Sequence, residues 1–134
     1  MINKLKLLKV ALGLGVVYYL VGAYVHFFGV TLFPWYDGRL YTPYHDSLIS
    51  LVAVVLALIL ITLARNPIKN IDMLRTVIFC LIMGSIFSIV IIYKIDFSSL
   101  GSPAKKIQTI TEGVVGFIYS AILIWLYPRK LTNK

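Results

Sequence analysis

Residues 47–64 read SLISLVAVVLALILITLA, a run without a single charged side chain. A helix needs about 20 mainly apolar residues to cross roughly 30 Å of hydrocarbon. This run therefore predicts a transmembrane helix. Three further stretches of the same character lie at residues 7–28, 73–93 and 107–127. We expect an all-α integral membrane protein in which residues 1–134 form one four-helix transmembrane domain.

The composition excludes most soluble classes. Apolar residues make up 60% of the chain and charged residues only 13%, whereas a soluble domain carries about 25% charged residues. The net charge of +8 would suit nucleic acid, but the basic residues lie in short clusters between the apolar runs. That distribution predicts the lipid bilayer as partner and no nucleic acid. Cys80 is the single cysteine, so no intrachain disulfide or cysteine metal site is possible.

The basic clusters predict the orientation in the membrane. Lys and Arg flank the membrane ends of helices most heavily on the cytoplasmic side. One set of flanks holds Lys4, Lys6, Lys9, Arg65, Lys69, Arg75, Arg129, Lys130 and Lys134. The other set holds only Arg39, Lys94, Lys105 and Lys106. We expect a multi-pass protein of the inner (plasma) membrane, with both termini in the cytoplasm.

Small residues predict how the helices pack, since close contact joins helices in lipid. Each span carries a seam of such residues at helical spacing, which favours one compact antiparallel bundle. The same seams also suit a homo-oligomer. The seams are Gly15, Gly22 and Gly29; Ser50, Ala53 and Ala57; Cys80, Gly84 and Ser88; and Gly113, Gly116 and Ser120.

The connection at residues 31–46 differs from the other two. It is rich in aromatic residues, and it contains Asp37-Gly38 between Pro34 and Pro43. Asp-Gly between aromatic and apolar residues is a hairpin signal. We expect a short, hairpin-like cap on the outer face, either as a functional loop or as an interfacial anchor.

Ionisable residues in or beside the spans gather at the outer end. His26 shares a helical face with Gly22 and Gly29, Asp46 lies one turn from Ser50, and Glu112 shares a face with Gln108, Gly116 and Tyr119. In an antiparallel bundle these faces meet near the outer mouth. An ionisable group within a span is costly, so it is a functional-site hypothesis. The predicted ligand-binding residues are His26, Trp35, Tyr44, His45, Asp46, Gln108, Glu112 and Tyr119.

Structural roles compete with this hypothesis. Asp46 suits a helix cap, and His26 suits a bond to a tyrosine or a carbonyl. Glu112 is close enough to the interface to reach water or to pair with Lys105 or Lys106. Asp37 and Arg39 suit turn chemistry and surface charge. Two histidines and a few carboxylates would suit zinc, iron or manganese, but no ligand spacing such as HxxxH supports a metal. No catalytic residue is predicted, and the sequence does not identify a cofactor.

The stretch FPWYDGRLYTPYHDSLI, residues 33–49, followed by a long apolar helix, resembles the BphX-like family of small bacterial membrane proteins. It is similar at greater distance to DoxX-type four-helix membrane proteins. The resemblance implies a bacterial inner membrane and four spans. It implies no activity and no catalytic residue, but it draws attention to residues 34–46.

The sequence thus favours a small membrane binding or accessory protein over an enzyme. Its outward-facing pocket would take an amphipathic molecule such as a lipid, a quinone or an aromatic compound. Two alternatives stay open. One is a subunit of an oligomeric transporter or proton-linked carrier, and the other is a membrane redox enzyme subunit.

Overall fold

The computed structural model describes residues 3–100 and 104–128, and these form four long α-helices and two short 3-10 turns. The helices are α1 (Lys4–Phe28), α2 (Pro43–Arg65), α3 (Ile71–Lys94) and α4 (Ala104–Leu126). All four are long and apolar enough to cross a membrane. The all-α, four-span fold predicted from the sequence is confirmed, and the chain is a multi-pass membrane protein.

Each helix begins a few residues before its predicted start, because polar residues and a proline belong to the first turns. Asn3 caps α1 by accepting a hydrogen bond from the backbone N–H of Leu5. Pro43 stands at the beginning of α2, where its fixed φ and missing N–H suit the first turn. Pro43 therefore begins the helix, whereas the sequence placed it in the preceding loop.

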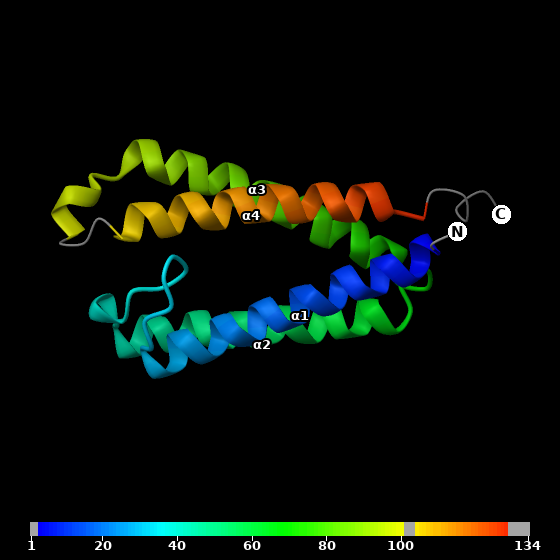
Figure 1. Ribbon diagram of the computed structural model, residues 1–134, viewed down its shortest axis with the longest axis horizontal. Helices are drawn as coiled ribbons and strands as arrows, with labels where there is room; N and C mark the ends of the chain where they lie inside the picture. The colour runs from blue at the N-terminus through cyan, green and yellow to red at the C-terminus, as the bar shows by residue number, and fades with distance from the viewer. Residues whose placement is uncertain (1–2, 101–103, 129–134) are drawn as a thin grey trace.

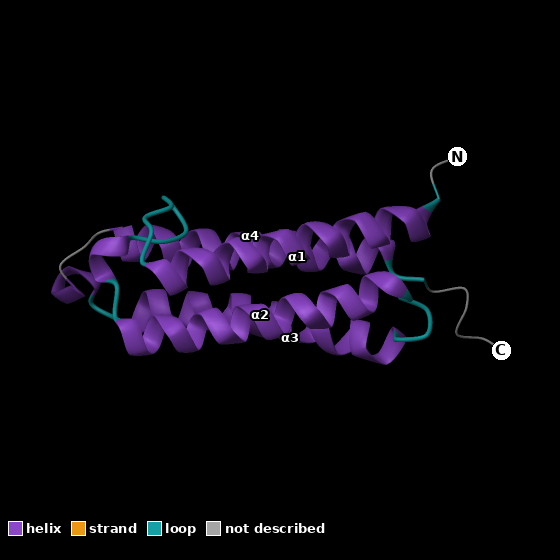
Figure 2. Cartoon of the chain, turned by 90° about the horizontal axis from the view of Figure 1, so that it is seen from below, coloured by secondary structure: helices purple, strands orange, loops and turns teal. Residues whose placement is uncertain are grey.

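The helices form two antiparallel hairpins, α1 with α2 and α3 with α4 (Figure 1). The start of α1, the end of α4 and the connection 66–70 lie at one end, which we call the basic end (Figures 1 and 2). Residues 29–42 and 95–100 lie at the other, which we call the loop end. Arg129, Lys130 and Lys134, which were part of the orientation prediction, lie outside the described residues.

A leucine-rich core joins the two hairpins in the half of the bundle near the basic end. It includes Leu8, Leu12, Leu60, Leu63, Leu74 and Leu123. Tyr119 of α4 adds a polar link, because its hydroxyl donates to the carbonyl of Ala11 in α1 at 3.0 Å. Toward the loop end the hairpins diverge, and the segment 29–42 lies between them (Figure 1).

Within each hairpin, small residues allow close packing. In the first hairpin Ser50, Ala53 and Ala57 are buried, as their spacing predicts, and Ser50 donates to the Ala23 carbonyl at 2.9 Å. In the second hairpin the seam of α3 differs from the prediction. Cys80 is exposed, and a Cβ at Gly84 would meet nothing within 4 Å. Ser88, which was predicted, faces Gly113, and Ser85, which was not predicted, faces Gly116.

The segment 29–42 reverses direction earlier than the sequence suggests. Leu32 and Tyr36 exchange two backbone hydrogen bonds of 2.9 Å, so the hairpin-like turn spans residues 33–35 and not Asp37-Gly38. Asp37 instead caps the 3-10 turn Gly38–Leu40. The hairpin prediction was right about the segment and wrong about the turn residues, because the Asp37 side chain satisfies a local backbone N–H.

Candidate functional site

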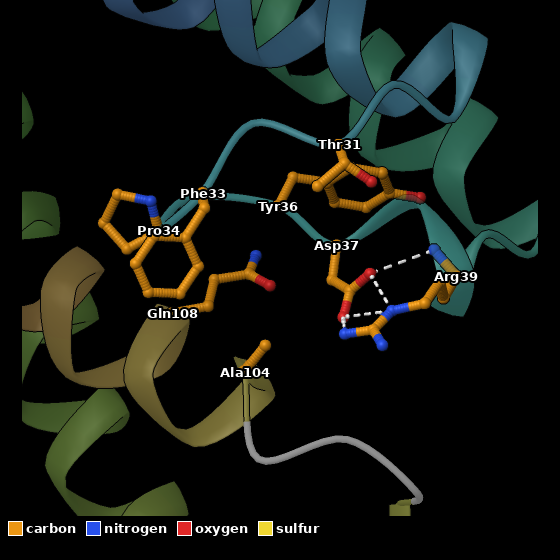
Figure 3. Close-up of a pocket in the computed structure, with 8 residues that line it drawn as sticks. All are labelled: Thr31, Phe33, Pro34, Tyr36, Asp37, Arg39, Ala104 and Gln108. Atoms are coloured by element: carbon orange, nitrogen blue, oxygen red, sulfur yellow. Dashed lines mark hydrogen bonds and ion pairs between the residues drawn. The ribbon is translucent and has the colours of Figure 1, made fainter.

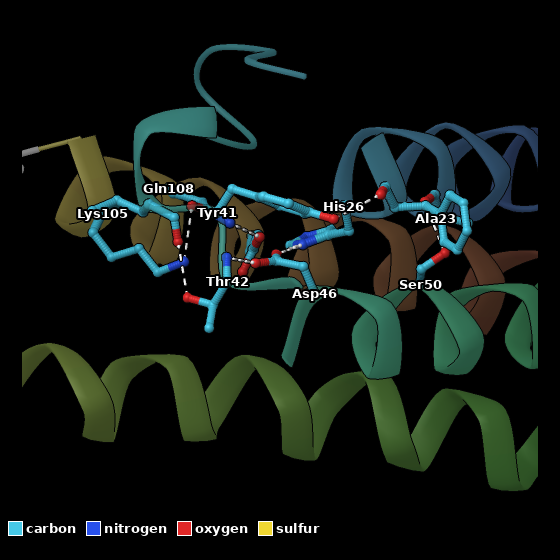
Figure 4. Close-up of polar contacts among 11 residues, drawn as sticks. Ala23, His26, Tyr41, Thr42, Asp46, Ser50, Lys105 and Gln108 are labelled. Carbon is cyan, nitrogen blue, oxygen red and sulfur yellow. Dashed lines mark hydrogen bonds and ion pairs between the residues drawn. The ribbon is translucent and has the colours of Figure 1, made fainter. Parts of the chain in front are cut away.

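A short ion-pair contact joins the two helices of the first hairpin at the loop end (Figure 4). His26, in the last turn of α1, places Nδ1 2.6 Å from Oδ1 of Asp46, in the first turn of α2. Oδ2 of Asp46 accepts the backbone N–H of Thr42 at 2.6 Å. Only 12% of the His26 side chain and 7% of the Asp46 side chain are exposed. Asp46 therefore accepts the N–H of Thr42, the residue that precedes α2, and it also pairs with His26, a partner that the sequence did not predict for either residue.

Tyr36 covers this pair. Its ring lies 4.4 Å from the His26 ring, measured between centroids. The hydroxyl is buried and makes no hydrogen bond of ordinary geometry with the described residues. Burial, and then the nearby Asp46 carboxylate, raise the pKa of Tyr36 above its ordinary value. The Tyr36 hydroxyl is thus a neutral, poorly satisfied group beside the His26–Asp46 pair.

Asp37 and Arg39 form a second ion pair in the same segment. The guanidinium Nη2 lies 2.8 Å from Oδ2 of Asp37, and Nε lies 3.0 Å from Oδ1. Asp37 is buried, whereas the Arg39 side chain is 78% exposed. The hydrogen bonds to Asp37 raise the pKa of Arg39. From the sequence, Asp37 was expected to form a turn and Arg39 to be a surface charge. In the structure they form a bidentate ion pair, and both line a pocket.

That pocket has a volume of about 200 Å³ and lies between the segment 29–42 and the beginning of α4 (Figure 3). Phe33 and Pro34 supply an apolar wall, while Asp37, Arg39 and Gln108 supply charge and hydrogen-bonding groups. The complete lining is Thr31, Phe33, Pro34, Tyr36, Asp37, Arg39, Ala104 and Gln108. An apolar wall with a few polar groups is the usual composition of a small-molecule site.

A polar ladder continues down α4 from the pocket. Lys105 donates to Oε1 of Gln108 at 3.4 Å, and Nε2 of Gln108 donates to Oε1 of Glu112 at 2.9 Å. Because α4 begins at Ala104, Glu112 lies about 12 Å along the helix axis, deeper than the sequence suggested. Neither Lys105 nor Lys106 pairs with it directly, so the ion pair that the sequence left open as one structural role of Glu112 is not formed.

Apart from Gln108, none of the predicted site residues lines the pocket, and this includes His26, Asp46 and Glu112. Trp35 is partly exposed beside Pro34, and Tyr44 and His45 are exposed and contact each other, with ring centroids 5.5 Å apart. Tyr119 belongs to the packing near the basic end. The structure therefore brings together His26 with Asp46 and Gln108 with Glu112, and it separates Tyr44, His45 and Tyr119 from the pocket lining. Whether any of these residues binds a ligand stays a prediction.

Sequence reasoning missed most of the pocket lining. Only Gln108 among the lining residues was in the predicted set. The aromatic and charged composition of residues 31–46 indicated that this segment could form a site. It did not indicate which of its side chains turn toward α4. Among the described residues, no group of three or more His, Cys, Asp and Glu side chains is placed to hold a metal ion.

Comparison with known proteins gave no match among family models, curated proteins or solved structures. The resemblance to the BphX-like family stays a prediction, and function has to be argued from the geometry.

Proposed function

We propose that this chain is a small binding or accessory protein of the bacterial inner membrane that holds an amphipathic small molecule at its loop end. One observation carries the proposal: segment 29–42 and the beginning of α4, which belong to different hairpins, line a common pocket. Phe33 and Pro34 would contact the apolar part of the ligand, and Gln108 and Arg39 would contact its polar part. The resemblance of residues 33–49 to the BphX-like family supports the membrane assignment.

The pocket volume limits what enters it. At about 200 Å³, it is smaller than the roughly 300–1,000 Å³ of typical ligand sites. A quinone ring, a single aromatic ring or a lipid headgroup fits this volume, and a long tail does not. The tail of an amphipathic ligand would therefore extend outside the pocket, between or along the apolar helices.

The proposed orientation places the loop end outside the cytoplasm. The described basic residues at the basic end support it, since they include Lys4, Lys6, Lys9, Arg65, Lys69 and Arg75. Single cysteines introduced at Ser99 and at Asn66 in a Cys80→Ala background test this orientation. A membrane-impermeant maleimide applied to whole cells with a permeabilised outer layer should label position 99 and leave position 66 unlabelled. The reverse labelling would reject the orientation.

Thermal stabilisation by added ligands tests the binding function. Purified protein would be melted in detergent with short-chain quinones, single-ring aromatic compounds and lipids. A ligand present at 100 times its Kd should stabilise the protein by about 2.7 kcal/mol. Phe33→Ala and Gln108→Ala should each reduce this stabilisation, while Tyr44→Ala, which alters an exposed side chain near the segment, should not. The pocket would be rejected as the site if a ligand stabilised all three variants equally. It would also be rejected if no ligand stabilised the unaltered protein.

A further inference from the structure

Positive charge gathers around the pocket at the loop end. Arg39 lines it from the segment between α1 and α2. Lys105, in the first turn of α4, places Nζ 3.4 Å from Oε1 of Gln108, which lines the pocket from α4. Lys106 follows in the same turn, which contains no acidic residue. Among the described residues that line the pocket only Asp37 is acidic, and its pair with Arg39 offsets its charge.

Arg39 keeps hydrogen-bond donors available although it is paired. Asp37 accepts from Nε at 3.0 Å and from Nη2 at 2.8 Å. A guanidinium has five N–H donors in a planar fork, so the two hydrogens of Nη1 and the second hydrogen of Nη2 are not used by Asp37. These hydrogens form the edge that matches the two oxygens of a phosphate or a carboxylate. Because Asp37 is buried and the Arg39 side chain is 78% exposed, the pair holds that edge in one orientation and leaves it accessible.

Lys105 forms no ion pair with the described residues. It donates instead to the uncharged amide of Gln108, whose Nε2 is bound to Glu112. A lysine in the first turn of a helix also lies at the positive end of the helix dipole, where an anion is favoured. The loop end holds fewer basic residues than the basic end, so the proposed orientation in the membrane does not explain the lysines there. An anion bound beside Lys105 offsets this positive charge.

The lining has an apolar side and a charged side. Figure 3 shows Phe33 and Pro34 at one side of the pocket and Arg39 at the other. We propose that the pocket binds the anionic headgroup of an amphipathic ligand, a phosphate or a carboxylate held by Arg39 and Lys105. The volume of about 200 Å³ admits such a group and leaves an alkyl tail outside. This inference rests on the proposed binding function and specifies its ligand class.

Two amphiphiles with the same tail test the inference. Dodecyl phosphate carries a net negative headgroup, whereas the choline of dodecylphosphocholine cancels that charge. The protein would be melted in dodecyl maltoside micelles at fixed ionic strength across a concentration series of each. Dodecyl phosphate should raise the melting temperature saturably, with an apparent Kd roughly tenfold or more below that of dodecylphosphocholine, because charge-assisted hydrogen bonds depend on the net charge. Inorganic phosphate, which has the charge but no tail, should bind more weakly than dodecyl phosphate.

Two lysine variants of equal net charge separate a local contact from general attraction. Lys105→Gln should weaken binding of dodecyl phosphate severalfold, whereas Lys69→Gln, which alters the connection at the basic end, should leave it unchanged. Both variants lower the net charge by the same amount, so long-range attraction to the protein is equal in the two. Arg39→Lys keeps a cation beside Asp37 but loses the planar fork, so it should also weaken binding.

Equal apparent Kd values for dodecyl phosphate and dodecylphosphocholine would overturn the inference, and so would equal losses of binding in Lys105→Gln and Lys69→Gln. The comparison of the two amphiphiles needs only the unaltered protein, so it decides the matter even where a variant fails to fold. Binding of inorganic phosphate as tight as that of dodecyl phosphate would overturn the assignment to an amphipathic ligand. Stabilisation by an uncharged quinone that depends on Phe33, without a response to dodecyl phosphate, would reject the anionic ligand and leave the proposed function standing.

Discussion

The Nδ1 atom of His26 and the Oδ1 atom of Asp46 lie 2.6 Å apart, joining the end of α1 to the beginning of α2. An ionised carboxylate only accepts hydrogen bonds, so Nδ1 carries the proton in this contact. A neutral His26 then presents Nε2 as an acceptor, and a protonated His26 presents it as a donor. Since Asp46 also accepts the Thr42 N–H, one carboxylate fixes the histidine, the helix start and the end of the segment 29–42.

Replacing Asp46 should therefore destabilise the loop end strongly. Asp46→Ala leaves the His26 Nδ1 and the Thr42 N–H without their acceptor in a largely buried site. We expect a loss of about 2–3 kcal/mol in the free energy of unfolding, because bonds to charged groups and orphaned donors are both costly. Melting in detergent micelles measures the change. His45→Ala alters the exposed neighbouring residue and should shift stability by less than about 0.5 kcal/mol. Similar effects of the two substitutions would contradict the role given to Asp46.

Gly38 should tolerate no side chain, because a Cβ there would collide with the backbone oxygen of Gly29. Backbone cannot move aside as a flexible side chain can, so Gly38→Ala should displace the segment and cost about 1–3 kcal/mol. Gly22→Ala is the matched control, since a Cβ at Gly22 would meet nothing within 4 Å. It should be neutral or stabilising by up to about 1 kcal/mol. Melting temperatures of the two variants compare them directly, and a neutral Gly38→Ala would show that the segment does not pack against Gly29 in this way.

The spans were predictable because each segment meets the requirements for crossing hydrocarbon by itself. In lipid each backbone group must bond within its own helix, so length and hydropathy suffice to identify a span. The face of a helix that meets its neighbour also depends on the neighbouring helix, so one segment alone does not determine it. In α3 the predicted seam was Cys80, Gly84 and Ser88, but Gly113 and Gly116 of α4 face Ser88 and Ser85, so only one of the three predicted residues belongs to this contact.

In the candidate site, the contacts along and between helices were predictable and the pocket lining was not. Helical phase placed His26 and Asp46 on faces that meet, and it placed Gln108 and Glu112 together. The pocket lining was not predictable, because the path of residues 29–42 depends on contacts between residues 7 and 14 positions apart, which no periodic pattern indicates. Thr31 accepts the N–H of Gly38 at 2.9 Å, and Tyr41 donates to the Phe27 carbonyl at 3.1 Å. These contacts decide which side chains turn toward α4.

Tyr36 should make stability depend on pH in the alkaline range. Burial and the Asp46 carboxylate raise its pKa in the folded protein, whereas in the unfolded chain it titrates near its ordinary value of about 10. The contribution of neutral Tyr36 to stability is therefore complete below about pH 10 and is lost as the pH rises above that value. Tyr36→Phe should lose less stability between pH 8 and pH 11 than the unaltered protein does. Tyr44→Phe, an exposed control, should follow the unaltered protein, and identical pH profiles for all three would contradict the prediction.

Tyr119 and Gly15 should determine how firmly the two hairpins hold together. The Tyr119 hydroxyl donates to the Ala11 carbonyl, and a Cβ on Gly15 would collide with that hydroxyl and with Leu60. Tyr119→Phe removes only the hydrogen bond, and such bonds between membrane helices contribute about 0.6 kcal/mol on average and at most about 1.7. In Gly15→Ala the new Cβ meets the far ends of the Tyr119 and Leu60 side chains, which can shift. That shift moves the Tyr119 hydroxyl away from Ala11, so we expect a loss similar to that of Tyr119→Phe. Gly13→Ala, which would meet nothing within 4 Å, is the control. Unfolding in mixed detergent micelles should show similar losses for Gly15→Ala and Tyr119→Phe, and both losses should exceed that of Gly13→Ala. A Gly15→Ala protein as stable as Gly13→Ala would show that α1 and α4 do not meet at this point.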